Sequence, residues 1–184
     1  DHEKILEFLD SMPCDSENFV EDILRNLSSI FSFAHITFLR TDGSERYGDI
    51  TGYRIRSQSM QQYNAYYYTT DIFLPQNYSG PSRFRPKTVA TYTDMMSDSS
   101  YENTEFYRDF LRRENFYHEA AVYLRRGGRF IGAMGVFRDK DSGRFTQKEL
   151  TILETLTPFL SNGFYMHQKF CRFRRENQLY QKSL

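Results

Sequence analysis

The chain has 184 residues with 24 basic and 24 acidic side chains, so its formal net charge is zero. This length fits one ordinary domain with a buried core, and the balanced charge excludes a general electrostatic attraction to nucleic acid or membranes. No apolar run reaches the roughly 18 residues that span a bilayer. No signal peptide opens the chain, and the two cysteines, Cys14 and Cys171, lie far apart. We therefore expect a cytoplasmic protein without a membrane partner.

The first 31 residues are expected to form one or two helices. Apolar residues between positions 5 and 12 precede a break at Pro13, and Ser16 is placed to cap a second helix. From Phe19 to Phe31 the apolar side chains recur at helical spacing and form one stripe. This stripe predicts packing in a core or in a dimer.

Strand and turn patterns follow these helices. Residues 35–40 are expected to form a strand, which Asp42-Gly43 turns into a second strand near residues 50–55. Residues 88–93 suggest a further short strand. Ser99 to Glu102 matches a capping box. The helix that it opens would carry along one side Phe106, Tyr107, Phe110 and Leu111.

Tyrosine is concentrated in one part of the chain. Seven of the fourteen tyrosines lie between Tyr47 and Tyr78, and the sequence has no tryptophan. Ser57 to Thr70 is predicted to be a helix, on which Tyr63 and Tyr67 share one face. A tyrosine has an apolar ring and a hydroxyl, which suits a site that is apolar yet orients a polar ligand group. The alternative is an aromatic helix that packs on the core.

A long loop follows the tyrosine block. Residues 74–87 contain three of the five prolines, and loops of this length often serve as lids. Arg83, Arg85 and Lys87 would make such a lid cationic. The alternative for each of these charges taken alone is a solvated surface loop.

The clearest pattern is a β-hairpin, in which Gly127-Gly128 separates two runs of strand-forming residues. A two-residue loop of this kind needs positive φ, which glycine adopts readily. We expect residues 118–126 and 129–138 to be antiparallel neighbours, with Val122 and Leu124 buried beneath the terminal helices. One face would pair Leu124 with Ile131, Val122 with Ala133 and Ala120 with Gly135. The other would pair Tyr123 with Gly132, Ala121 with Met134 and Glu119 with Val136.

A long helix is expected after the hairpin. Thr146 and Glu149 match a capping box, and leucines at 150, 153, 156 and 160 repeat at helical spacing. Pro158 predicts a kink because it removes a backbone hydrogen bond. Most charged side chains in residues 165–184 are basic, and most of those in residues 1–24 are acidic. The two ends could therefore lie together or pair across a dimer.

From Thr88 to Phe164 the chain resembles the second half of a GAF domain, of the kind that precedes the DNA-binding module in LuxR-type bacterial regulators. The resemblance rests on the aromatic run 106–111, the hairpin, and Gly143-Arg144-Phe145-Thr146 before the leucine-rich helix. It implies an α+β fold with a GAF/PAS-like central antiparallel sheet. The N- and C-terminal helices would cover one face, and a helix- and loop-covered pocket the other.

The resemblance also implies how the chain is divided. Residues 1–15 would be a helical lead-in, 16–168 the GAF-like sensor domain, and 169–184 a helical extension toward an output domain outside this chain. The implied role is ligand sensing within a transcriptional regulator, with an unknown small-molecule effector as partner and DNA contacted only through the output domain. The tyrosines before Asp71 also resemble the autoinducer-binding domain of LuxR proteins. This chain departs from that pattern, because Ile72 stands where that family has proline, so an acyl-homoserine lactone is not the expected ligand.

The predicted ligand site lies where the tyrosine block meets the outer face of the hairpin, with Gly132 leaving a gap in that face. Two carboxylates there favour a ligand with a hydrogen-bond donor or a positive charge. Arg83 and Arg85 at the mouth favour an anion, so the sign of the ligand charge stays open. The predicted ligand-binding residues are Tyr63, Tyr67, Asp71, Phe73, Tyr92, Tyr107, Glu119, Tyr123 and Met134.

Catalytic patterns are not apparent in the sequence. No Ser-His-Asp or Cys-His set can be assembled, and His167 with Cys171 gives too few ligands for a metal site. Arg126 to Arg129 is a hairpin turn rather than a phosphate loop. The Asn-Lys-Phe-Asp-Glu signature of cyclic-nucleotide GAF domains does not occur, and both cysteines lie near the chain ends. We predict no enzyme activity, no metal and no cofactor.

The assembly is predicted to be a homodimer with two-fold symmetry through the terminal helices. The stripe from Phe19 to Phe31, together with Leu160, Phe164 and Phe170, looks larger than one sheet face can cover. Ligand binding would then alter how these helices pair. The alternatives are a ligand-free structural dimerisation domain and, less favoured, a GAF-family enzyme.

Overall fold

The computed structural model describes residues 2–13, 16–41, 47–77 and 87–182. Its centre is a five-stranded antiparallel sheet with the strand order β2-β1-β5-β4-β3. The strands are β1 (His35–Thr41), β2 (Tyr47–Tyr53), β3 (Val89–Thr91), β4 (His118–Arg126) and β5 (Arg129–Arg138). The predicted turn at Asp42-Gly43 and most of the predicted lid, including Arg83 and Arg85, lie outside the described residues. Lys87 forms an ion pair with Asp94.

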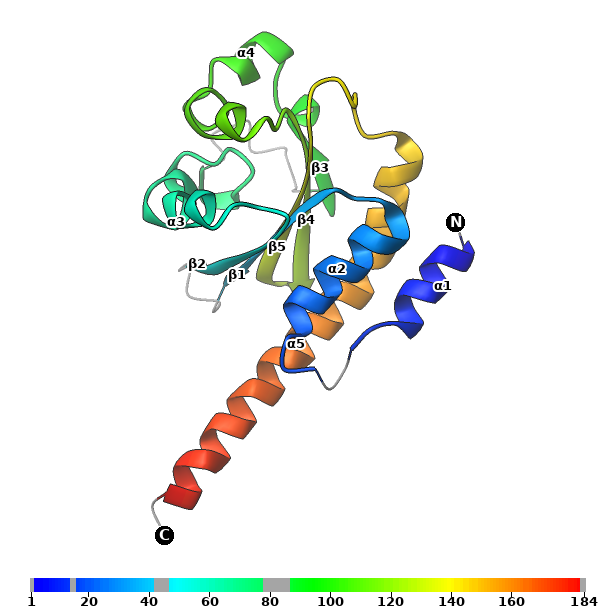
Figure 1. Cartoon of the computed structure of the whole chain (residues 1–184), viewed down its shortest axis with the longest axis vertical. Coiled ribbons are helices and arrows are strands. Elements are labelled where there is room, and N and C mark those ends of the chain that lie inside the picture. The colour runs from blue at the N-terminus through cyan, green and yellow to red at the C-terminus, as the bar shows by residue number, and fades with distance from the viewer. Residues whose placement is uncertain (1, 14–15, 42–46, 78–86, 183–184) are drawn as a thin grey trace.

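Helices from both ends of the chain cover one face of the sheet (Figure 1). They are α1 (His2–Asp10), α2 (Phe19–Phe31) and α5 (Gln147–Lys182). α2 contacts β1 and β2, α5 contacts β4, and α1 packs against α2 and α5. The last turns of α5 extend well past the body of the domain (Figure 1). No helix in the described ranges is both long enough and apolar enough to span a bilayer.

The core beneath these helices, which we call the helix-side core, is mainly aliphatic. Leu24, Leu27, Leu153 and Leu156 from the helices have no exposed surface. They pack on Ile36, Phe38, Val122, Leu124 and Val136 of the sheet. Burying such a side chain stabilises the fold by about 1.5–3 kcal/mol. This core holds the terminal helices to the sheet.

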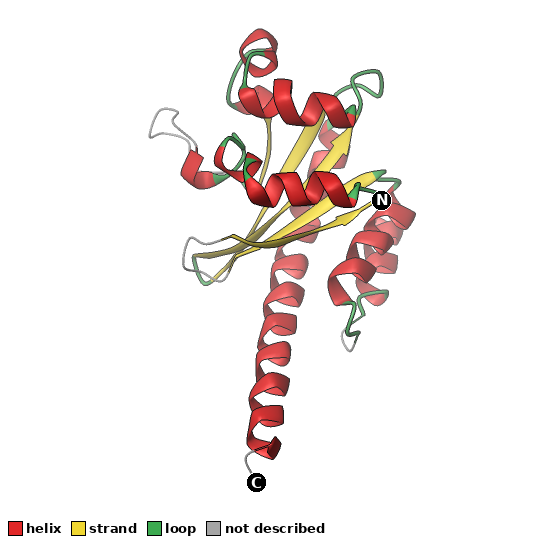
Figure 2. Ribbon diagram, turned by 60° about the vertical axis from the view of Figure 1, so that its left-hand side comes forward, coloured by secondary structure: helices red, strands yellow, loops and turns green. Residues whose placement is uncertain are grey.

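Short helical segments cover the opposite face, so the sheet lies between two layers (Figure 2). They begin with α3 (Ser57–Ala65), η1 (Tyr67–Thr69) and η2 (Pro75–Asn77), and continue with η3 (Tyr92–Asp94) and α4 (Asp98–Glu102). The π-helical η4 (Phe106–Phe110) and η5 (Leu111–Glu114) complete the layer. Their buried side chains form a second core, the pocket-side core, which is rich in Phe and Tyr.

The predicted hairpin is confirmed. β4 and β5 pair along their lengths, Gly127 and Gly128 have φ of +56° and +77°, and Val122 and Leu124 are fully buried in the helix-side core.

The predicted hairpin register is wrong beyond the first two pairs. Arg126 pairs with Arg129 and Arg125 with Phe130 as expected, but an irregularity next to Leu124 shifts the remaining pairs by one residue. Leu124 therefore lies opposite Gly132. A one-residue shift exchanges the two faces of a strand. Met134 and Val136 consequently belong to the helix-side core, and Ala133 and Phe137 to the pocket-side core.

The start of α5 matches the predicted capping box. The Glu149 N–H donates to Thr146 Oγ1 over 3.3 Å, and the Thr146 N–H donates to Glu149 Oε2 over 2.7 Å. The helix continues through Pro158.

Two other helices differ from the prediction. α3 ends at Ala65 because Tyr66, with φ −149° and ψ −52°, leaves the helical conformation. The helix expected from Ser99 instead begins after Ser97, whose hydroxyl accepts from the Ser100 N–H, and it ends at Glu102. Several nearby serines offer equivalent caps, and tertiary packing selects among them.

The apolar stripe behind the predicted dimer is mostly buried within one chain, so this part of the prediction is wrong. Phe19 and Phe164 are each 2% exposed and Leu160 is fully buried, whereas Phe170 is exposed. The expectation that the two ends lie together is met by an ion pair between Arg174 and Glu17 at 2.8 Å.

Candidate functional site

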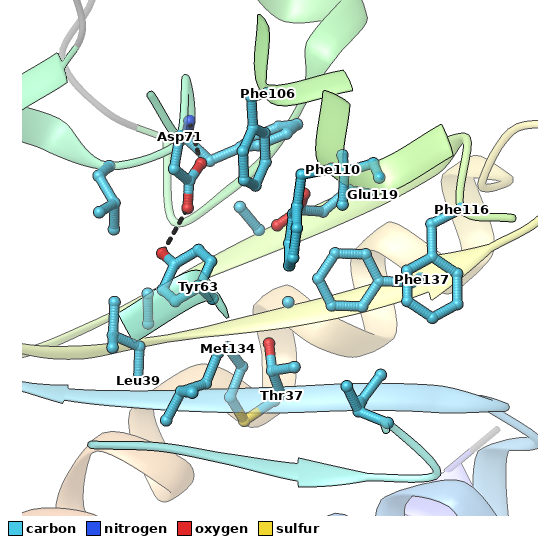
Figure 3. Close-up of a pocket in the computed structure, with 18 of the residues that line it drawn as sticks. Thr37, Leu39, Tyr63, Asp71, Phe106, Phe110, Phe116, Glu119, Met134 and Phe137 are labelled. Atoms are coloured by element: carbon cyan, nitrogen blue, oxygen red, sulfur yellow. Dashed lines mark hydrogen bonds between the residues drawn. The ribbon is translucent and has the colours of Figure 1, made fainter. Parts of the chain in front are cut away.

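A pocket lies between the outer face of the sheet and the segments α3, η4 and η5 (Figure 3). The hollow has a volume of about 630 Å³, including the part open to solvent, but the centres of water-sized molecules can occupy only about 50 Å³ of it. That space holds several waters or a small organic group. Its walls are formed by Thr37, Leu39, Ile50, Ile55, Ser59, Met60, Tyr63, Asp71, Phe73, Leu74, Phe106, Phe110, Leu111, Glu114, Phe116, Glu119, Ala121, Tyr123, Ala133, Met134, Gly135 and Phe137.

One wall is organised by Asp71, which is 5% exposed. Its carboxylate accepts hydrogen bonds from the Tyr63 hydroxyl over 2.6 Å and from the Phe73 N–H over 2.8 Å. The Tyr123 hydroxyl donates to the Phe73 carbonyl over 2.7 Å and ties this wall to β4. Burial raises the pKa of Asp71 to about 6, although its hydrogen bonds act in the opposite direction. Asp71 is therefore a satisfied acceptor that fixes the geometry of the wall.

Glu119 differs from Asp71 in its hydrogen bonding. It sits in β4, is 5% exposed, and its Oε2 atom is buried without a hydrogen-bond partner. Figure 3 shows its carboxylate beside Phe110 and directed toward the interior of the pocket. Burial, and then the nearby charge of Asp71, raise the pKa of Glu119 well above its usual value. A buried acceptor of this kind is costly unless something else donates to it.

A glycine makes room for this carboxylate. A Cβ at Gly135 would lie 3.0 Å from Glu119 Oε1 and 2.5 Å from the Phe137 ring. The gap was predicted at Gly132, but a Cβ there would meet Phe38 of the helix-side core and the Leu39 carbonyl. The register shift in β5 explains why the gap lies three residues further along.

The third carboxylate of the lining, Glu114, lies next to an exposed cation. Arg56 donates to it through both Nε and Nη2, the former over 3.0 Å. The charge of Glu114 is thus balanced by a guanidinium, in contrast to the charges of Asp71 and Glu119.

The predicted ligand-binding residues are only partly brought together. Six of the nine line the pocket: Tyr63, Asp71, Phe73, Glu119, Tyr123 and Met134. Met134 borders it while its side chain packs in the helix-side core.

The other three predicted residues lie outside the lining. Tyr67 stacks on Phe110 with ring centroids 4.7 Å apart and donates to the Asp109 carbonyl, which places it behind the wall. Tyr92 and Tyr107 both pack against Tyr101 and Tyr117, in a separate tyrosine cluster. The early end of α3 accounts for the position of Tyr67, and the broken helix after Ser97 for that of Tyr107. Tyr92 begins η3, directly after β3.

Several lining residues were not predicted as ligand contacts. Phe106 and Phe110 were expected only as a helix side, and their four-residue spacing was the available signal. Phe137 faces the pocket because of the register shift. The contribution of Thr37 and Leu39 depends on the pairing of β1 with β5. In the described parts of the chain, no three His, Cys, Asp or Glu residues are grouped so as to hold a metal ion.

Comparisons with known proteins match at the level of structure. No protein-family model matches the sequence, and no curated protein matches it. The ligand-binding domain of VqsR from Pseudomonas aeruginosa superimposes with a TM-score of 0.62 at 16% identity, covering 92% of this chain and 96% of that one. CepR2 from Burkholderia cenocepacia, described as an N-acylhomoserine lactone dependent LuxR family transcription factor, gives 0.59 at 14% identity, covering 92% and 98%.

A GAF domain, solved in its photoproduct state, also matches. The GAF3 domain of Slr1393 from Synechocystis sp. PCC6803 gives a TM-score of 0.57 at 17% identity, covering 85% of this chain and 98% of that one. These similarities confirm the α+β, GAF-like fold, which this chain shares with the VqsR ligand-binding domain, the LuxR-family factor CepR2 and the GAF3 domain. At such identities they establish the fold alone.

Proposed function

We propose that this chain is a regulatory ligand-sensing domain of a bacterial transcriptional regulator, and that a small molecule binds in the pocket behind Glu119. The observation that carries the proposal is that Glu119 lines the hollow and that its buried Oε2 atom lacks a donor. A filled structural core would leave neither the hollow nor the unpaired acceptor. The similarity to the VqsR ligand-binding domain and to CepR2 supports the same reading.

Strand β4 is the proposed connection between ligand and terminal helices. Glu119 and Tyr123 face the pocket, while Ala120, Val122 and Leu124 on the same strand pack in the helix-side core. The Arg125 N–H also donates to Ser161 Oγ of α5 over 3.2 Å. A ligand that displaces β4 would therefore move α5.

The proposed assembly is a homodimer through α5. Among the side chains of α5 whose burial is described, the large exposed apolar ones are Phe159, Met166, Phe170 and Phe173, with exposures of 46–61%. Their spacings of seven, four and three residues match one seam of a coiled coil. A second copy of the chain would cover this seam. The proposed setting is the cytoplasm, with DNA contacted by an output domain beyond this chain.

A ligand-free dimerisation domain is the alternative favoured by the aromatic packing, since Tyr63, Phe106 and Phe110 already contact one another.

We propose that the domain is not an enzyme. A chemical change in a bound compound during incubation with the purified protein would contradict this.

Mass spectrometry of small molecules released from the purified chain tests the sensing function. We expect one compound in near-stoichiometric amount. Ala133→Leu would fill the pocket and abolish its retention, whereas Ala65→Leu adds the same side chain at an exposed position and retains the compound. If the chain releases nothing, and small molecules stabilise neither the wild type nor the control variant, the sensing function is wrong.

A further inference from the structure

We propose that the ligand of this pocket is a small organic ammonium compound, whose N–H group binds Glu119 and whose apolar body packs among the phenylalanine rings. This inference rests on the proposed sensing function and adds the chemical class of the ligand. It follows from hydrogen bonding, charge, ring chemistry and size.

Hydrogen bonding identifies the atom that contacts the ligand. The Asp71 carboxylate is already engaged by Tyr63 and Phe73, and Glu114 by Arg56. Glu119 Oε2 has no such donor. A donor on the ligand would satisfy it, and an N–H group is the common donor that can also carry a positive charge.

The charges of the pocket lining favour a positively charged donor on the ligand over a neutral one. The described residues that line the pocket include three carboxylates and no lysine, arginine or histidine. Arg56 balances Glu114 from an exposed position, which leaves Asp71 and Glu119 in the interior. An anion placed there would face two acids, whereas an ammonium group would relieve their mutual repulsion. Glu119 also borders a second hollow, of about 350 Å³ including the part open to solvent, that includes Arg144. That guanidinium is paired with Asp98.

The rings of the lining suit the same ligand. Phe106, Phe110, Phe116 and Phe137 are all buried at the pocket, and Figure 3 shows Phe110 next to Glu119. Aromatic faces attract cations, most strongly where water is excluded. The restricted free space admits an amine with a compact body. A long acyl chain would require several rings to move.

Three probes that differ mainly in charge test this inference: 2-phenylethylamine, 2-phenylethanol and phenylacetate. Each is titrated calorimetrically into the full chain. We expect the amine to bind at least about tenfold more tightly than the other two, as a charge-assisted contact implies. Glu119→Gln should remove about tenfold of the amine affinity and leave the alcohol unchanged. Glu154→Gln removes the same charge from an exposed site and should change neither the amine affinity nor the alcohol affinity.

Phe110→Leu provides a second variant that does not depend on the carboxylate. It should weaken binding of the amine more than binding of the alcohol, because it removes a ring face but keeps an apolar side chain. Four outcomes would each overturn the inference. They are preferential binding of phenylacetate, equal binding of the three probes, absence of amine binding, and an amine affinity that Glu119→Gln leaves unchanged. A neutral or anionic compound released by the purified chain would overturn it too, while leaving the sensing function intact.

Discussion

The two faces of the sheet are built from different chemistry. The helix-side core is dominated by fully buried aliphatic residues such as Leu24, Leu153 and Leu156. The pocket-side core contains ring systems, tyrosine hydroxyls and two buried acids, and it surrounds a hollow. Aliphatic side chains close-pack without polar requirements, whereas buried acids must be satisfied individually. The contrast fits our proposal, in which one face supplies stability and the other accepts a ligand.

The largest expected effect is on the helix-side core. Leu156→Ala should lower the free energy of unfolding by about 2–5 kcal/mol, because a fully buried leucine leaves a cavity. Urea denaturation measures this. Phe116→Leu, at the pocket, should cost clearly less because its surroundings are already open. Equal losses would remove the contrast between the two faces.

The buried acids should make stability depend on pH. The raised pKa of Asp71, about 6, means that the folded protein holds this proton more tightly than the unfolded chain, whose ordinary value is 3.8. Its contribution is therefore full below about pH 4 and is lost as pH rises through about 6. Asp71→Asn should remove on the order of 3 kcal/mol of this dependence while keeping an acceptor for Tyr63.

Denaturation curves recorded between about pH 4 and 8 for wild type and variant test this. Parallel pH profiles would show that Asp71 is not protonated preferentially in the folded state. Glu119→Gln should also flatten the dependence of the unfolding free energy on pH, since the pKa of Glu119 is raised by burial and by Asp71.

A smaller loss is expected when a hydrogen bond of the wall is removed. Tyr63→Phe deletes the donor that lies 2.6 Å from Asp71 and should cost about 1–3 kcal/mol, because a buried carboxylate loses a partner. Urea denaturation measures the loss. In the Asp71→Asn background the loss of unfolding free energy caused by Tyr63→Phe should shrink. If the losses of the two single variants simply add in the double variant, the two groups act independently.

The smallest effect on folding is expected at the exposed seam of α5. Phe173→Glu should leave the unfolding free energy within about 0.5 kcal/mol of wild type, because the residue is 61% exposed. It should nevertheless weaken self-association measured by sedimentation at roughly tens of micromolar. Thr151→Glu adds the same charge to an exposed residue of α5 outside the seam and serves as control. A wild-type protein that is monomeric at these concentrations would contradict the proposed dimer.

Local sequence determined the features that depend on a few adjacent residues. Gly127-Gly128 specified the hairpin turn because glycine adopts positive φ, and Thr146 with Glu149 specified the start of α5 through reciprocal hydrogen bonds. The aromatic and acidic residues of the pocket were recognisable from their residue types, and Tyr63, Asp71 and Glu119 lie at its wall.

Tertiary structure decided which side chains share a face. The irregularity next to Leu124 places Phe137 and Gly135 at the pocket and Met134 in the helix-side core, since strand faces alternate with every residue. The early end of α3 moved Tyr67 out of the lining, the separate turns after Ser97 moved Tyr107, and Tyr92 lies in η3 directly after β3. Whether the Glu119 carboxylate has a donor likewise depends on residues distant in the chain. Such contacts are set by packing across the whole domain, which short sequence patterns do not encode.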